Sequence, residues 1–173
     1  MDKHVKYVLA IIVLCVFSKI AYAELFHSPL HGFSIEIPDD WSKRKPKKPW
    51  TLFVFAKLGS GENLNMNVLP ARGLHSIKQV SLEQLMYPYY EHLKILQKSY
   101  ETTNGTDFLK CIYKYNDGDL RKKLEGKYKL KHYCIQWIRG EKLYTLSFVD
   151  SEINFPRNIR RFIAVGNSIE FDN

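Results

Sequence analysis

The sequence predicts an α+β fold in which an antiparallel sheet of about six strands is sandwiched by helices. Three observations lead to this prediction. Short alternations of apolar and polar residues recur along the chain, most clearly at 63–68. Several of these segments are joined by tight turns, which favour antiparallel pairing. Two other segments, after residues 80 and 155, space their apolar residues as a helix does.

Three strands are predicted in the first half of the chain. Residues 33–37 alternate and stop at Pro38, and residues 50–56 are rich in aromatic and β-branched side chains. Residues 63–68 set apolar side chains on one face against asparagines on the other. The Gly-Ser-Gly sequence at 59–61 predicts a hairpin turn between the last two strands.

A helix is predicted in the middle of the chain. Ser81 and Gln84 have the spacing of a capping box, and apolar residues then follow at helical spacing as far as Leu96. Pro88 lies inside this pattern, where proline removes a hydrogen bond and crowds the preceding turn. We therefore expect a kink or a restart of the helix at Pro88.

Three more strands and a second helix complete the predicted domain. The strands are expected at about 106–115, 128–138 and 142–149. The helix is expected from about Pro156 to Val165, with Asn154 as its cap and Gly166 as its stop. One side of this helix is apolar and the other carries arginines, so it can cover one face of the sheet.

The N-terminus has the three parts of a cleavable signal peptide. A basic stretch at 3–6 precedes an apolar run of eleven residues at 7–17, and Ala-Tyr-Ala at 21–23 supplies a cleavage site. The run is short of the roughly 20 residues that a membrane-spanning helix needs. We expect residues 1–23 to be a signal peptide, with an uncleaved anchor as the alternative. Residues 24–173 are then one domain, periplasmic or secreted.

Positive charge is concentrated in two stretches of a chain whose formal net charge is +8. The first stretch combines aromatic and basic residues: Trp41, Lys43, Arg44, Lys45, Lys47, Lys48 and Trp50. Its two prolines exclude a helix and a central strand, so it is predicted to be an exposed loop. The second stretch comprises Arg121, Lys122, Lys123, Lys127, Lys129 and Lys131.

These basic stretches have two interpretations. As a docking surface they would bind an anionic partner, such as membrane headgroups, lipopolysaccharide, nucleic acid or an acidic protein. Alternatively they are solvated turns, and Trp41 and Trp50 anchor the ends of the first one in the core. Export moves the expected partner away from nucleic acid and towards envelope components, including peripheral contact with a membrane.

Two cysteines remain after the predicted cleavage, Cys111 and Cys134. If strands 106–115 and 128–138 pair around residue 122, opposed residues have numbers that sum to about 244, and these two sum to 245. An exported protein can hold such a pair as a cross-strand disulfide. The alternative is two buried free thiols.

Sequence motifs of enzymes and metal sites are absent. There is no H-E-x-x-H, C-x-x-C, G-x-S-x-G or P-loop sequence. His27 and His31 are four residues apart, but Pro29 argues against a helix that would align them. No catalytic residue, metal ligand or cofactor is therefore predicted. A hydrolase site assembled in space from Asp, His and Ser remains an alternative.

The segment from Leu30 to Trp41 resembles the opening of PsbP-like domains, which reads Gly-Phe-x-Ile-x-hydrophobic-Pro-x-x-Trp. That family includes the photosystem II accessory protein PsbP and bacterial envelope proteins of the DcrB type. The resemblance extends to the order of the later strands and helices. It implies an α/β/α sandwich and a non-catalytic binding or accessory role.

Together these observations predict an exported, non-catalytic binding or accessory protein of the cell envelope. It would act through the basic loop, and its partner would be a protein or an anionic envelope component. The alternative from another class is an immunity-type inhibitor that neutralises a toxin directed at the envelope.

Overall fold

The computed structural model of the chain describes residues 23–79, 81, 92–115 and 129–172. This part of the chain contains ten strands, one α-helix and one short 3-10 helix. The strands are β1 Ala23–Ser28, β2 Phe33–Pro38, β3 Trp41–Arg44, β4 Thr51–Lys57, β5 Asn63–Pro70, β6 Leu93–Thr103, β7 Thr106–Tyr115, β8 Leu130–Arg139, β9 Lys142–Ser151 and β10 Glu170–Phe171. The helices are η1 Ile77–Gln79 and α4 Phe155–Asn167.

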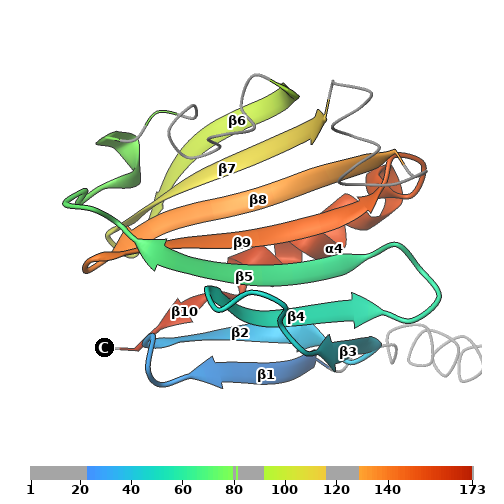
Figure 1. The fold of residues 1–173 in the computed structure, drawn as a ribbon, viewed down its shortest axis with the longest axis horizontal. Helices are drawn as coiled ribbons and strands as arrows, with labels where there is room; N and C mark the ends of the chain where they lie inside the picture. The colour runs from blue at the N-terminus through green and yellow to red at the C-terminus, as the bar shows by residue number, and fades with distance from the viewer. Residues whose placement is uncertain (1–22, 80, 82–91, 116–128, 173) are drawn as a thin grey trace, which may run out of the picture.

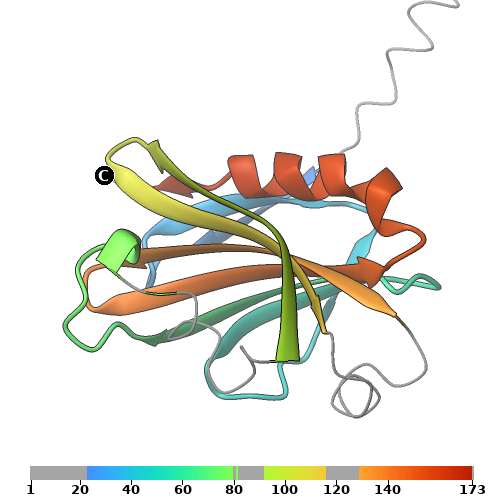
Figure 2. The ribbon, with the colours of Figure 1, turned by 90° about the horizontal axis from the view of Figure 1, so that it is seen from above.

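The strands form two antiparallel sheets (Figure 1). The large sheet has seven strands in the order β3-β4-β5-β9-β8-β7-β6, and the small sheet has three in the order β1-β2-β10. The small sheet and α4 lie side by side on the same face of the large sheet (Figure 2). This face is therefore covered by a helix and a second sheet.

Apolar side chains of the two sheets and α4 form the main core. The Trp137 indole stacks on the Tyr144 ring at 5.2 Å, and Phe33 of the small sheet meets both rings edge-on. Phe162 of α4 stacks on Phe148 of β9 at 5.1 Å. These aromatic contacts fix the helix and the small sheet on the large sheet.

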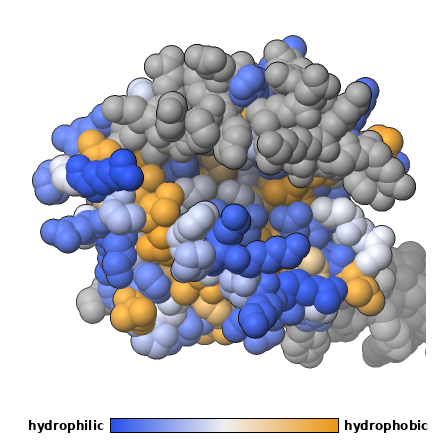
Figure 3. All heavy atoms as spheres, in the orientation of Figure 1, coloured by the Kyte–Doolittle hydropathy of each residue, from blue (hydrophilic) through white to orange (hydrophobic). Residues whose placement is uncertain are grey.

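The opposite face of the large sheet carries a second core and a polar region. Ile77 of η1 packs there against buried side chains of β7 and β8, among them Leu109 and Ile138. Towards β4 and β5 this face is hydrophilic (Figure 3). The asparagines of β5 lie here because the alternate residues Leu64 and Met66 enter the main core.

All six predicted strands are confirmed. The strands expected at 33–37, 50–56, 63–68, 106–115, 128–138 and 142–149 correspond to β2, β4, β5, β7, β8 and β9. The second helix is also confirmed as α4, and Asn154 is its N-cap residue, although its side chain makes no capping hydrogen bond. Gly166, predicted as its stop, lies inside the helix, which continues to Asn167 and has Ser168 as its C-cap.

The prediction of a sheet sandwiched by helices needs correction. Within the described residues the one α-helix shares its face of the large sheet with the small sheet, which takes the place expected for a helix. Two of the three strands of the small sheet were not predicted. β10 is only two residues long, and β1 begins at Ala23, within the sequence assigned to the cleavage site.

The mid-chain helix prediction is wrong at its C-terminal end. Leu93 and Leu96 lie in β6, while residues 82–91 are outside the described residues. The pairing of β6 with β7 shifts register between Ile95 and Gln97. A bulge inserts one extra residue into a strand. Across this bulge the apolar residues Leu93 and Leu96 are three residues apart, and that spacing imitates a helix.

Candidate functional site

The first basic stretch, residues 41–50, is called the basic segment from here on. Its first four residues form β3, an edge strand of the large sheet, and were predicted as loop. Pro46 and Pro49 lie beyond the strand and leave its pairing with β4 intact. Trp41 is buried against Phe162, and the Arg161 guanidinium lies over its indole at 5.5 Å. Trp41 therefore anchors the segment in the core.

The rest of the basic segment is exposed. Among the residues that the structure describes, none forms an ion pair with its five cations, which are Lys43, Arg44, Lys45, Lys47 and Lys48. Trp50 is 45% exposed, and the Lys48 ammonium lies 5.5 Å from its ring centre. The segment thus presents a cationic surface that includes one accessible indole.

An ionic cluster fixes the base of this segment. Asp40, which precedes β3, accepts hydrogen bonds from both terminal nitrogens of Arg161 and lies 3.1 Å from the Lys57 ammonium. Glu62 is only 5% exposed and lies 3.9 Å from the charged nitrogens of both Lys57 and Arg161. The hydrogen bond from Arg161 lowers the pKa of Asp40, whereas burial raises the pKa of Glu62.

The second basic stretch is only partly described, since residues 121–127 lie outside the described residues. Lys131 is on β8, with its ammonium 5.9 Å from the Phe155 ring at the start of α4. Three strands separate β8 from β3 in the large sheet, which places the two strands roughly 20 Å apart. Lys131 and the basic segment therefore belong to separate parts of the sheet.

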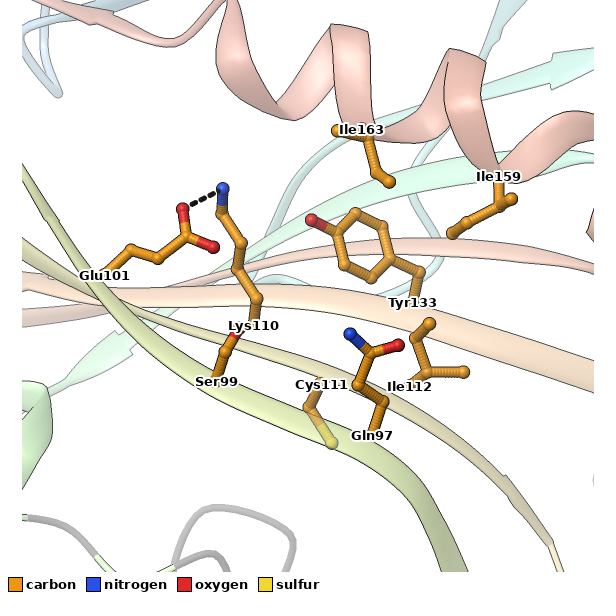
Figure 4. Close-up of a pocket in the computed structure, with 9 residues that line it drawn as sticks. All are labelled: Gln97, Ser99, Glu101, Lys110, Cys111, Ile112, Tyr133, Ile159 and Ile163. Carbon is orange, nitrogen blue, oxygen red and sulfur yellow. Dashed lines mark hydrogen bonds and ion pairs between the residues drawn. The ribbon is translucent and has the colours of Figure 1, made fainter.

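A groove between α4 and the neighbouring strands was not predicted. It contains two hollows of about 160 Å³ and 320 Å³ that share Glu101 and Lys110 in their walls. Figure 4 shows the smaller one, with Ile159 and Ile163 of α4 above Tyr133 of β8. We call this feature the α4 groove. Its residues come from three distant parts of the chain, so no local sequence pattern could have revealed it.

The polar groups of the α4 groove are held close together. Lys110 donates hydrogen bonds to the Glu101 carboxylate at 2.6 Å and to the Asn167 side-chain oxygen at 3.2 Å. Burial raises the pKa of Tyr133 further above its ordinary value of 10, and its hydroxyl is protonated at neutral pH. The groove thus combines an ammonium–carboxylate pair, a phenol and a wall that includes apolar side chains of α4.

Cys111 and Cys134 are opposed residues in the pairing of β7 with β8, so the predicted register is confirmed. Both are free, buried thiols in the structure, and the predicted disulfide is not formed there. A hydrogen bond between the two lowers the pKa of Cys111 and raises that of Cys134. The pair is thus positioned for a bond, and its formation remains a prediction.

The histidines singled out in the sequence have different partners. His27 pairs with Asp172 at 3.2 Å, and His31 lies 3.4 Å from the Tyr144 hydroxyl. Nowhere in the described ranges do three potential metal ligands of the His, Cys, Asp and Glu types gather. Within the described residues, no helix is both long enough and apolar enough to span a bilayer.

Comparison with solved structures decides the fold. The solution structure of cyanobacterial PsbP from Synechocystis sp. PCC 6803 matches with a TM-score of 0.63 at 15% identity, covering 89% of this chain and 95% of that one. The chain has a PsbP-like fold. Other structures of this fold also match.

A point mutant of the protein Mog1 matches with a TM-score of 0.57 at 10% identity, covering 88% of this chain and 97% of that one. LpqN, described as involved in cell envelope biogenesis of Mycobacterium tuberculosis, matches with a TM-score of 0.54 at 9% identity, covering 94% of this chain and 97% of that one. No family model and no curated protein matches the sequence. At these identities the PsbP-like fold is shared, and function has to be argued from the sites.

Proposed function

We propose that this protein is an exported, non-catalytic accessory protein that docks on an anionic component of the cell envelope through the basic segment. The observation that carries the proposal is the set of five cations that no described residue neutralises. They lie on an edge strand and the following loop, where a partner can approach without displacing other parts of the fold.

The anchoring of the segment supports this function. Trp41 is fixed in the core, and Asp40 holds the preceding turn through Arg161 and Lys57. A surface whose base is held in place loses less conformational entropy on binding than a free tail does. Cations that already lie together also attract an acidic partner more strongly than single charges do.

The fold and the predicted leader support the same compartment. The signal peptide predicted at residues 1–23 would direct the chain out of the cytoplasm, and LpqN, which shares the PsbP-like fold, is described as involved in cell envelope biogenesis. The anionic component can be a lipid, a glycan or an acidic protein, because each presents negative charge to the segment.

A pull-down from the envelope fraction tests the proposal. The bait is the mature protein, compared with a variant in which the five cations of the segment are changed to Gln. A matched control changes five exposed cations elsewhere, and these are Arg72, Lys98, Lys142, Arg157 and Arg160. We expect the segment variant to lose the captured component and the control to retain it.

Two other results would redirect the proposal. Capture that is equal for both variants would show that the segment is not the docking surface. One acidic protein captured in stoichiometric amount, with loss of its toxicity, would identify an inhibitor instead.

A further inference from the structure

We propose that the α4 groove binds a long-chain carboxylate, with the hydrocarbon chain along α4 and the carboxylate on Lys110. This inference concerns a different part of the molecule from the basic segment and does not depend on its docking function. It assigns a ligand class to a site that combines an apolar wall with a single, well-held cation.

The groove exists because α4 covers only part of its face of the large sheet. At Gly166 the helix approaches β8 so closely that an added Cβ would lie 2.2 Å from Cδ1 of Ile135. β6 and β7 continue the sheet beyond the helix and curve up beside it (Figure 2). A trough therefore runs between the helix and these two strands.

The walls of the trough suit a hydrocarbon chain. Ile159, Ile163 and Ile112 line the smaller hollow, and Phe108, Ile135 and Ile169 line the larger one. Ile163 is 39% exposed, so a ligand in the smaller hollow can cover its side chain. The larger hollow alone reaches the lower limit of about 300 Å³ for small-molecule sites. An apolar chain placed here would remove exposed apolar surface from water.

The Lys110–Glu101 ion pair lies where the two hollows meet, and its geometry indicates a carboxylate headgroup. The Lys110 side chain is 17% exposed and is also held by Asn167, whereas the Glu101 side chain is 47% exposed on the edge strand β6. Glu101 can turn into solvent more easily than Lys110 can. A ligand carboxylate can thus replace that of Glu101 at Lys110 and join the two hollows.

The Tyr133 hydroxyl supplies a second polar group at this point. Figure 4 shows its ring standing between the sheet and α4, with the hydroxyl towards the Lys110 side of the hollow. Because this phenol is protonated at neutral pH, it can donate a hydrogen bond to a carboxylate without repelling it.

Binding of cis-parinaric acid, whose fluorescence rises in an apolar site, tests the proposal on the mature protein. We expect saturable binding that Ile163→Glu abolishes, because the new carboxylate enters the groove. Ala164→Glu is the matched control, since this exposed residue is next along α4 and lines neither hollow. No fluorescence rise with the wild type, or equal binding by both variants, would overturn the proposal.

Two further variants test the role of the ion pair. Lys110→Met should weaken binding of the acid about tenfold or more, because a charge-assisted hydrogen bond is lost. Glu101→Gln should tighten binding of the acid, because the internal competitor for Lys110 is removed. Neither change should alter binding of the methyl ester of the probe. If the acid and its ester respond alike, Lys110 does not hold the headgroup and the carboxylate assignment is wrong.

Discussion

Glu62 and Asp40 show how opposite environments act on two carboxyl groups of one ionic cluster. Asp40 is partly exposed and receives hydrogen bonds from Arg161, which favour its charged form. Glu62 is buried, and the cations of Lys57 and Arg161 are 3.9 Å away, so burial outweighs their attraction. The cluster that fixes the basic segment is therefore sensitive to pH.

We predict that Glu62→Gln raises the free energy of unfolding at neutral pH. Burial raises the folded pKa of Glu62 above its ordinary value of 4.5, so the charged form is disfavoured by folding. This destabilisation is present when the pH exceeds the pKa of Glu62 in the folded state. It disappears as the pH falls to the pKa of Glu62 in the unfolded state. Urea unfolding from neutral to acidic pH should show the difference between variant and wild type closing near pH 4.5.

Asp40→Asn should behave in the opposite way. The lowered pKa of Asp40 stabilises the fold above its ordinary value of 3.8, and this contribution is lost as the pH falls below it. Because the pair is partly exposed, the expected loss of stability at neutral pH is less than about 1 kcal/mol.

A Glu62→Gln protein that is less stable than the wild type at neutral pH would contradict this account of the cluster.

At Cys111 and Cys134 we predict a disulfide in the exported protein. The two residues are directly opposed on β7 and β8, and the envelope is an oxidising compartment. Non-reducing mass spectrometry should give a mass lower by two hydrogen atoms than the reduced protein. Cys111→Ser should then lower the stability of the oxidised protein by about 3 kcal/mol. Two alkylatable thiols in the native exported protein would exclude the bond.

At the scale of elements, the contact of α4 with β8 depends on Gly166. We predict that Gly166→Ala lowers stability by about 1 kcal/mol, because the crowding at Ile135 outweighs the better helix propensity of alanine. Ile135→Val removes the crowding atom and should recover part of that loss in the double variant. Urea unfolding of the wild type, the two single variants and the double variant measures this coupling. Strictly additive effects on stability would show that crowding between residues 166 and 135 does not cause the loss.

The accuracy of the sequence predictions also varied by element. β8 and β9 were predicted because their apolar residues and the turn at Gly140 agree with each other locally. β6 was missed because its bulge at residues 95–97 broke the alternation. β10 depends on pairing with β2 from the other end of the chain, which local patterns cannot show. β1 forms a local hairpin with β2, and it was not predicted because it begins within the sequence assigned to the cleavage site.

At the scale of the whole molecule, the two proposed sites lie towards opposite edges of the large sheet. The basic segment begins on β3, and the α4 groove is bordered by β6, six strand spacings or roughly 30 Å away. A partner docked on the segment would leave the groove open. The two proposed functions can therefore be measured separately.

The sequence predicted one of these sites and not the other for a physical reason. Five cations close to two prolines are visible locally, although the residue order alone does not decide whether Trp41 is buried. Lys110 and Glu101 became a site only because β6 pairs with β7 and α4 lies over their neighbour β8. Such a site depends on tertiary packing and is not visible in the residue order.

The salt dependence of envelope binding tests the central claim, docking through the basic segment, most directly. The measurement is the fraction of mature protein that sediments with isolated envelope membranes at increasing salt. Screening weakens exposed charge contacts, so we predict strong binding at low salt that falls steeply as salt rises. The five-Gln segment variant should bind weakly throughout, and the matched control should follow the wild type. Equal, salt-independent sedimentation of all three proteins would contradict the claim.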